Sequence, residues 1–481
     1  MSATAPAAFD AAPPTTPYPK RWAAATVMIV AALLDMIDGS IVNTALPAIG
    51  HGLSATPTQL QWIVSAYLLG FASTLIIAGH LGDRFGRKTL FLTGVGGFAA
   101  ASLASALAGG AAELVAARAI QGVAAAVIMP QVLGSFRTMF GGEERGKVFA
   151  VYGAIAGSAV AAGVLLGGVL TDLDLFGWGW RTIFAVNIPL AVVVIALGAL
   201  WIPGGGERTP GRIGLPGNII LAASLVAVVL PLVEGRAHGW PLRGWICLGA
   251  GVFGLIALSI TQSVRGTEHP LLPLGLFRSR AFGAGLAIQL LFYGAMSGFM
   301  LAFTIWLQTG QGYSPAQAGL LMVAFSGGTF LTAPMVDGLL AKYGRAVLIF
   351  GGLALAGGFY RVQIAARHAA EIHTAAWPLV PGLLVAGGGL GLLIVPLANI
   401  VLSAVPAESA GGASGLFTTA QQFGGALGVA VIGNAFFAHA GSGLTNGIAH
   451  AGPWAVGALL ACAALCLVLP RITAGQQASE I

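Results

Sequence analysis

The sequence predicts an all-α integral membrane protein. Of its 481 residues, 57% are hydrophobic and only 8% are charged, whereas about 25% of the residues in a soluble domain carry a charge. Long apolar runs recur along the chain, each long enough to cross the roughly 30 Å hydrocarbon layer as a helix. Glycine is abundant, with 72 residues, which is typical of membrane helices that pack closely. Most of the chain is therefore expected to face lipid or other apolar helices.

Short charged or Gly/Pro-containing loops separate the apolar runs and divide the chain into fourteen predicted spans. The first nineteen residues are rich in Ala, Pro and Thr and are interpreted as a disordered tail, and residues 471–481 as a second tail. The predicted spans cover residues 22–47, 58–80, 88–108, 112–138, 147–171, 180–202, 213–233, 243–264, 281–308, 315–340, 345–366, 376–403, 410–437 and 453–470.

The basic residues predict how these spans are oriented. When alternate loops are assigned to opposite sides, the side of the termini receives sixteen lysines and arginines and the other side four. Basic loops favour the cytoplasmic side of a cell membrane. The sequence therefore predicts that both termini are cytoplasmic. The formal net charge of +6 is explained by these loops, so no nucleic-acid partner is predicted.

Two internal similarities predict a duplicated architecture. Residues 79–90 are similar to 337–348 at an offset of 258, and residues 118–130 are similar to 384–396 at an offset of 266. Duplicated halves are common in transporters. After the N-terminal tail, the predicted organisation has four parts. These are a six-helix bundle (20–203), a two-helix insert with linkers (204–266), a second six-helix bundle (267–470) and the cytoplasmic tail (471–481).

The first span carries two acids, Asp35 and Asp38, about one helical turn apart. An acid in a membrane is costly unless it is neutral, paired or near water, so it predicts a functional site. Asp38 lies about 13 Å and Arg118 about 9 Å below the same predicted outer surface. We hypothesise that Asp38, tuned by Arg118, and Asp35 load and discharge protons. The alternative is that both acids only form hydrogen bonds across the bundle.

A cytoplasmic loop after the second span identifies a family. Its pattern, Gly79-x-Leu81-x-Asp83-Arg84-x-Gly86-Arg87-Lys88, resembles the loop signature of the major facilitator superfamily. The resemblance implies the fold of that family, and a cytoplasmic gate in which Asp83 and the neighbouring arginines form a charge-relay latch between the two halves. The alternative of ordinary cytoplasmic loop charge explains the three cations but not Asp83 or the glycine spacing.

Further stretches resemble the fourteen-helix drug:proton antiporter branch of that family. They lie in the first, fourth, fifth and thirteenth spans, and in the fifth this chain has Val164 where the motif carries a proline. The resemblance extends from about Lys20 to Pro470, and it implies proton-coupled drug export. The stretches are Asp38-x-x-Ile41-Val42-Asn43-x-Ala45-Leu46-Pro47, Arg118-x-x-Gln121-Gly122, a helix-packing motif of Gly153, Gly157, Gly163, Gly167 and Gly168, and Gly411–Gln422, with Gln421 where arginine is common.

Other residues are weaker candidates. Asp337 is either a second proton or cation site or a partner for Lys342, and Glu234 at the end of the seventh span is either a loop residue or part of a site. Aromatic and amide side chains facing a central cavity suit flat, amphipathic, often cationic molecules. Each is also an ordinary packing residue. The candidate substrate contacts are Trp62, Tyr67, Gln121, Gln289, Phe292, Tyr293, Trp306, Phe325, Asn399 and Gln421.

These observations predict a function and exclude others. The sequence has no phosphate-binding Gly-x-x-x-x-Gly-Lys-Ser/Thr loop, no catalytic triad and no metal-ligand spacing. We therefore expect no enzymatic activity, no cofactor and no metal. The predicted function is proton-coupled export of hydrophobic, often cationic drugs or antibiotics by a monomer that alternates access. Two alternatives stay open: a dedicated exporter of one self-made metabolite such as an antibiotic or siderophore, and a non-transporting membrane sensor or scaffold.

Overall fold

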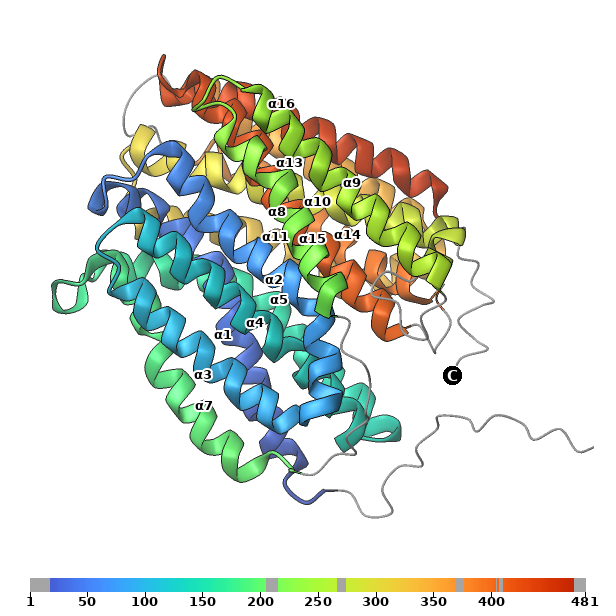
Figure 1. Ribbon diagram of the computed structural model, residues 1–481. Helices are drawn as coiled ribbons and strands as arrows, with labels where there is room; N and C mark the ends of the chain where they lie inside the picture. Colours follow the sequence, from blue (N-terminus) through green and yellow to red (C-terminus); the bar gives the residue numbers. More distant parts are fainter. Residues whose placement is uncertain are drawn as a thin grey trace, which may run out of the picture.

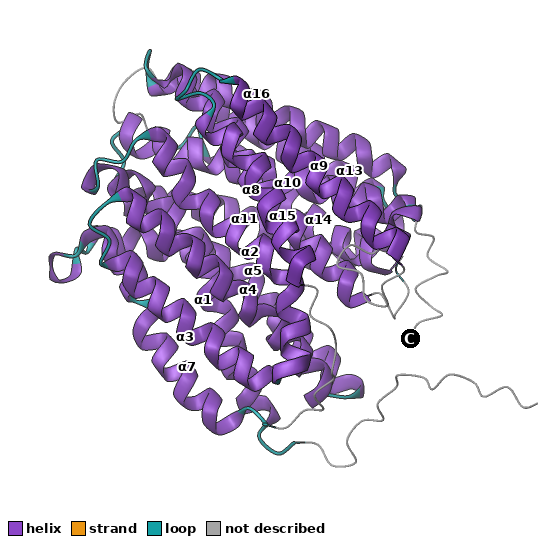
Figure 2. Cartoon of the chain, viewed as in Figure 1, coloured by secondary structure: helices purple, strands orange, loops and turns teal. Residues whose placement is uncertain are grey.

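A computed structural model describes residues 18–204, 215–265, 274–368, 376–403, 405 and 410–470. Within these ranges the chain forms helices, turns and loops, as Figure 2 shows. The predicted C-terminal tail and all but the last residues of the predicted N-terminal tail lie outside the described residues. An all-helical fold is confirmed.

The helices follow one another in three sets along the chain. The N-terminal group consists of α1 (Arg21–Gly52), α2 (Pro57–Phe85), α3 (Arg87–Ala106), α4 (Ala111–Met139), α5 (Gly142–Asp172), the short α6 (Thr182–Ala185) and α7 (Asn187–Trp201). Two helices come next, α8 (Leu215–Glu234) and α9 (Leu242–Arg265). The C-terminal group consists of α10 (Arg280–Ile305), the π-helical turn η4 (Trp306–Gly310), α11 (Pro315–Thr332), the turn η5 (Ala333–Met335), α12 (Val336–Tyr343), α13 (Ala346–His368), α14 (Val380–Ser403), α15 (Ala410–Ala440) and α16 (Leu444–Leu465).

Thirteen helices among the described residues are long and apolar enough to cross a membrane. In α5 the apolar helical segment is Ala162–Asp172, which is shorter than these thirteen. The chain is thus a multi-pass membrane protein, and the count of fourteen spans stays a prediction.

The helix ends repeat between the two groups. In α2 and in α11 a Thr or Ser caps the helix, a proline follows, and a glutamine closes a capping box with the cap residue. This arrangement satisfies backbone N–H groups that the first helical turn leaves unpaired. The two caps, Thr56 and Ser314, are separated by the same 258 residues as the turn glycines Gly86 and Gly344, which both have positive φ angles of 93° and 56°. The duplication predicted from the sequence therefore extends to local structure.

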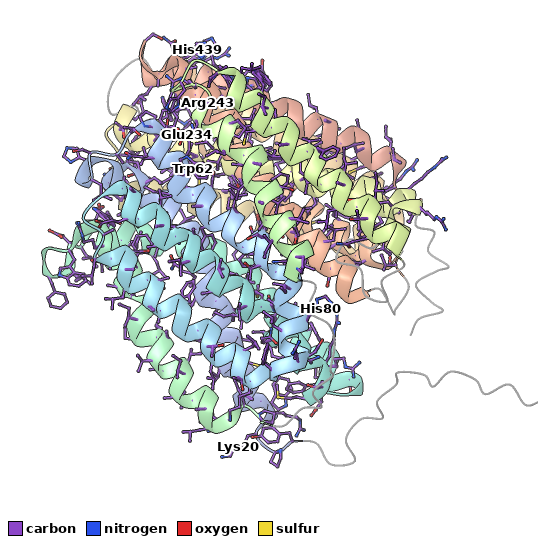
Figure 3. The ribbon with its side chains drawn as sticks, viewed as in Figure 1. Lys20, Trp62, His80, Glu234, Arg243 and His439 are labelled. Carbon is purple, nitrogen blue, oxygen red and sulfur yellow. The ribbon has the colours of Figure 1, made fainter. Side chains whose placement is uncertain are left out.

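The N-terminal and C-terminal groups each form a bundle, and the two bundles lie side by side, as the blue-to-green and yellow-to-red helices of Figure 1 show. Between the bundles, α2 packs against α15 and α5 packs against α11. Helix α8 contacts both α2 and α15. Figure 3 places Lys20 at one end of the molecule and Trp62, Glu234, Arg243 and His439 at the other. We call these the Lys20 end and the Glu234 end.

The two bundles are joined at the Glu234 end. The Asp172 carboxylate at the end of α5 accepts hydrogen bonds from Ser314 Oγ at 2.6 Å and from the Ala316 backbone N at 3.0 Å, at the start of α11. Gln308 Nε2 donates to the Thr44 carbonyl of α1 at 2.7 Å. A Cβ at Gly168 would collide with the backbone of Pro315. These contacts close this end of the interface between the bundles.

Glycine sets the distance between helices inside each bundle, and Gly122 of α4 is the clearest case. A Cβ there would collide with the backbone of Tyr67 in α2. Because backbone cannot rotate away as a side chain can, we expect Gly122→Ala to destabilise the fold by about 1–3 kcal/mol. Thermal unfolding in detergent measures this. Gly357→Ala in α13, where a Cβ meets nothing within 4 Å, is the control, and an equal melting temperature for the two variants would contradict the argument.

Candidate functional site

The carboxylate of Asp38 is the centre of a buried polar network in the N-terminal bundle. Asp38 has 0% exposure, and its carboxylate forms an ion pair with Arg118 NH1 from α4. Its Oδ1 atom also accepts from Gln121 Nε2 at 2.9 Å and from Asn187 Nδ2 at 3.0 Å. Three donors from α4 and α7 therefore surround one carboxylate of α1.

The Arg118 side chain is also buried and makes several contacts besides its ion pair with Asp38. Its side chain is 2% exposed and also donates to Gln121 Oε1 at 2.7 Å and to the Ile63 carbonyl at 3.4 Å. The guanidinium carbon lies 4.1 Å from the centre of the Tyr67 ring, within the range of a cation–π contact. The similar depths of Asp38 and Arg118 in the sequence predicted that they meet, and the ion pair confirms it.

Asp35 occupies a separate position in α1, toward the Lys20 end. The Tyr67 hydroxyl donates a hydrogen bond to Asp35 Oδ1. Because the same tyrosine ring lies against Arg118, it connects the two acids. Asp35 keeps 6% exposure where Asp38 has none. Both acids face the interior of the bundle and not lipid.

The glycines of α5 position the helix that carries the acids. A Cβ at Gly163 would collide with Ser40 and Ile37, and one at Gly167 would lie 2.7 Å from the Ile41 carbonyl. These glycines therefore let α5 contact α1 on both sides of Asp38 along the chain. A Cβ at Gly153 meets nothing within 4 Å, so this glycine makes no close approach. The surroundings of Gly157 lie outside the described residues.

The loop of the predicted gate lies at the Lys20 end. Asp83 forms an ion pair with Arg87 at 3.1 Å, four residues away, and a Cβ at Gly134 of α4 would meet the Arg87 guanidinium at 2.8 Å. Gly86 turns the chain with φ 93°. The ion pair thus lies within one bundle, and the latch between the bundles stays a prediction. Nearby, Gly79 approaches Pro130, and the Arg84 guanidinium lies 5.6 Å from the Phe85 ring centre.

The structure brings some of the candidate substrate contacts together. In the C-terminal bundle, Gln289 Nε2 donates to Gln421 Oε1 at 3.3 Å, between α10 and α15. Phe292 and Tyr293 follow Gln289 by about one turn of α10, and their ring centres are 4.8 Å apart. Phe325 is buried in α11. These side chains remain candidates for contact with a substrate.

Four of those candidates have partners in other parts of the protein, and their contact with a substrate stays a prediction. Tyr67 and Gln121 belong to the network of Asp35, Asp38 and Arg118 described above. Trp306 is 1% exposed and donates to Thr445 Oγ1 at 3.2 Å, inside the C-terminal bundle. Trp62 donates from Nε1 to Glu234 Oε1 at 2.8 Å, toward α8. Asn399 and the acid Asp337 are exposed, and neither lies in the buried network.

Sequence reasoning missed three residues of the site and its surroundings. Asn187 and Ser102 complete the network, with Ser102 Oγ 2.9 Å from Gln121 Nε2 and 3.4 Å from Asn187 Nδ2. Asp172 joins the two bundles. Asn187 and Ser102 are neutral and stand in no motif, so nothing in the sequence distinguishes them. Asp172 has a signal, because it is an acid at the end of an apolar span.

Two bundles of membrane-length helices that meet at one end, with a buried ion pair in the first, define a polytopic transport protein. A sequence profile described as "Major Facilitator Superfamily" matches residues 28–429 and residues 285–479. The chain belongs to this superfamily.

Curated relatives are similar over most of the chain. The "Probable actinorhodin transporter" of Streptomyces coelicolor is 38% identical over 442 residues, which cover 91% of this chain and 76% of that protein. The "Puromycin resistance protein pur8" of Streptomyces alboniger is 34% identical, with 94% and 92% coverage. The "Tetracenomycin C resistance and export protein" of Streptomyces glaucescens is 32% identical, with 86% and 76% coverage.

Solved structures agree in fold. The crystal structure of a peptide transporter, POT, in complex with sulfate superposes with a TM-score of 0.67 and covers 92% of this chain and 93% of its own, at 17% identity. At this identity the likeness establishes the transporter fold alone.

Proposed function

We propose that the protein exports hydrophobic, often cationic drugs or antibiotics in exchange for protons, by alternating access across the cell membrane. The observation that supports proton coupling is the ion pair of Asp38 and Arg118, which is buried among apolar helices. An acid at such a depth is expensive to keep, and transporters keep acids there for proton transfer. Export as the class of function is supported by relatives whose names refer to antibiotic transport, export or resistance.

The geometry suggests one half of the exchange cycle. Because the Glu234 end is closed by Asp172 and Gln308, we assign this conformation to access from the Lys20 end. In this conformation Asp38 is paired with Arg118. Protonation would neutralise Asp38 and end its attraction to Arg118, which would free α1 to move relative to α4. Asp35, one turn nearer the Lys20 end, is then placed to pass the proton on.

The arrangement in the membrane follows from the same proposal. We propose that the Lys20 end is cytoplasmic, so that protons leave Asp38 into the cytoplasm. The domain division at residues 20–203, 204–266 and 267–470 is proposed with it, as is action as a monomer. For the substrate site we propose the face of the C-terminal bundle that carries Gln289, Gln421 and Tyr293. Its amides and aromatic rings suit flat, amphipathic molecules.

A second candidate is dedicated export of one metabolite. The relatives in Streptomyces species named for actinorhodin and tetracenomycin C favour it. A competition panel of unrelated cationic dyes separates the two functions. A multidrug exporter is inhibited by several of them, whereas a dedicated exporter is inhibited by none.

Proteoliposomes test the proposal as a whole. With purified protein and a pH-sensitive dye inside, addition of ethidium or another cationic drug is expected to start proton flux in the direction opposite to the drug. Liposomes without protein are the control. Drug binding without any proton flux would contradict proton exchange, and the absence of both drug binding and drug movement would favour a sensor or scaffold.

A further inference from the structure

Helix α8 lies across the line where the two bundles meet. It packs against α2 of the N-terminal bundle and against α15 of the C-terminal bundle, and in Figure 1 it lies beside both. We call the contact between the last two helices the α2–α15 seam. Since α8 contacts both sides of the seam, it can resist their separation.

On the first side of the seam, α8 is bound by a tryptophan. Trp62 Nε1 of α2 donates to Glu234 Oε1 at the end of α8, with a distance of 2.8 Å. A hydrogen bond to a charged carboxylate is stronger than one between neutral groups. Glu234 is fixed in turn by His238, whose Nδ1 lies 3.1 Å from the Glu234 carbonyl and 3.5 Å from its Oε2. Figure 3 shows Trp62 and Glu234 near each other at this end.

On the second side of the seam, α8 is bound by an amide. Asn434 Nδ2 of α15 donates to the carbonyl of Leu232. This carbonyl belongs to the last turn of α8, where helical carbonyls have no N–H partner of their own. Asn434 thus satisfies an acceptor that the end of the helix leaves open. Two residues apart on α8, the carbonyl of Leu232 and the carboxylate of Glu234 therefore bind opposite bundles.

Two polar side chains of α2 close to Trp62 in the sequence have buried atoms without hydrogen-bond partners among the described residues. Gln61 and Ser65 of α2 are 1% and 0% exposed, and among the described residues their Oε1 and Oγ atoms have no hydrogen-bond partner. A Cβ at Gly433 of α15 would lie 2.9 Å from Gln61 Nε2, so the helices are in close contact here. A buried polar atom without a hydrogen bond destabilises the state that buries it. Opening of the seam to water would relieve this cost.

We infer that the end of α8 is a clasp that holds the α2–α15 seam closed at the Glu234 end. Trp62, Glu234 and Asn434 act as positioning residues that hold the α2–α15 seam closed. They oppose the opening of the seam, which hydration of Gln61 and Ser65 favours. Loss of either bond shifts the equilibrium toward the open seam. This role for the two helices between the bundles does not depend on proton exchange, since it concerns a conformational equilibrium in the absence of drug and gradient.

The rate at which a thiol at position 65 is labelled measures how often the seam opens. All three cysteines of the chain, Cys247, Cys462 and Cys466, are replaced by alanine, Ser65→Cys is added, and the protein is placed in nanodiscs. A hydrophilic maleimide then labels the thiol only when the seam opens. Trp62→Phe keeps the ring and removes the N–H donor, and Asn434→Ala removes the donor on the other side. Because a hydrogen bond contributes about 0.5–1.5 kcal/mol, we expect labelling to become about two- to twelvefold faster in each.

A matched control comes from the same region. Trp245 of α9 stacks on Trp240 with ring centres 5.6 Å apart and is 55% exposed, so Trp245→Phe changes a tryptophan outside the clasp. Its labelling rate is expected to equal that of the parent. The clasp is refuted if labelling is unchanged in a folded Trp62→Phe or a folded Asn434→Ala variant, or if Trp245→Phe accelerates it equally. The two test variants lie on different bundles, so either one that folds decides the result.

Discussion

The Asp38→Asn variant is expected to lose drug export driven by a pH gradient, by at least about tenfold in inverted vesicles, because an amide cannot carry a proton through this depth. The substitution preserves size, and its amide oxygen can still accept from Gln121 and Asn187, the partners at 2.9 and 3.0 Å. Because the substitution also leaves the buried Arg118 without its carboxylate partner, the melting temperature in detergent is measured beside export, and lost export counts as lost proton exchange only in folded protein.

Comparison with two further variants makes this result specific. Glu113→Gln changes an exposed acid of α4 whose carboxylate accepts from the Gly109 backbone N at 2.8 Å, and full export is expected. Asp35→Asn is expected to impair export less than Asp38→Asn, since the Tyr67 hydroxyl can donate to an amide oxygen as it does to the carboxylate. Full pH-driven export in both Asp35→Asn and Asp38→Asn would contradict the proposed mechanism.

Removal of the positive partner is expected to affect stability most. In Arg118→Gln the carboxylate of Asp38 is left buried without its ion pair, and such a charge costs about 3–5 kcal/mol. We expect a clearly lower melting temperature in detergent and a low yield of folded protein. The control is Arg361→Gln, which changes an exposed arginine of α13 and should alter stability by no more than about 0.5 kcal/mol.

The double variant Asp38→Asn with Arg118→Gln separates stability from function. Neutral amides at both positions leave no unpaired buried charge, so the melting temperature is expected to recover most of the loss seen in Arg118→Gln. Export driven by protons stays absent, because no titratable group remains at the centre of the network. A melting temperature of the double variant as low as that of Arg118→Gln alone would argue against a direct ion pair.

Apolar run length predicted the helices well, because the thickness of the hydrocarbon layer fixes the length of a helix that crosses it. The predicted span at 180–202 matches the apolar segment Gly179–Trp201, for example. Depth along two helices was also enough to pair Asp38 with Arg118. These successes concern position along a helix axis, which the count of residues determines directly.

Rotation about the helix axis was not predictable in the same way. Lipid and neighbouring helices are equally apolar, so the pattern of apolar residues hardly distinguishes their faces. Trp62 and Trp306 were therefore expected at a substrate cavity, whereas one binds α8 and the other is sealed within the C-terminal bundle. The contribution of Asn187, and the contacts of α8 with both bundles, likewise depend on tertiary packing that no local pattern encodes.

Proton release on drug binding tests the central claim most directly. Detergent-solubilised protein in weakly buffered solution is mixed with a cationic drug such as ethidium, and the pH is followed with an indicator dye. If drug and proton exchange at the Asp38 site, the wild-type protein releases protons on binding the drug and the Asp38→Asn variant binds the drug without releasing them. Equal release from both proteins, or binding to the wild type with no release at any pH between 6 and 9, about the range in which a buried carboxyl can titrate, would contradict the account.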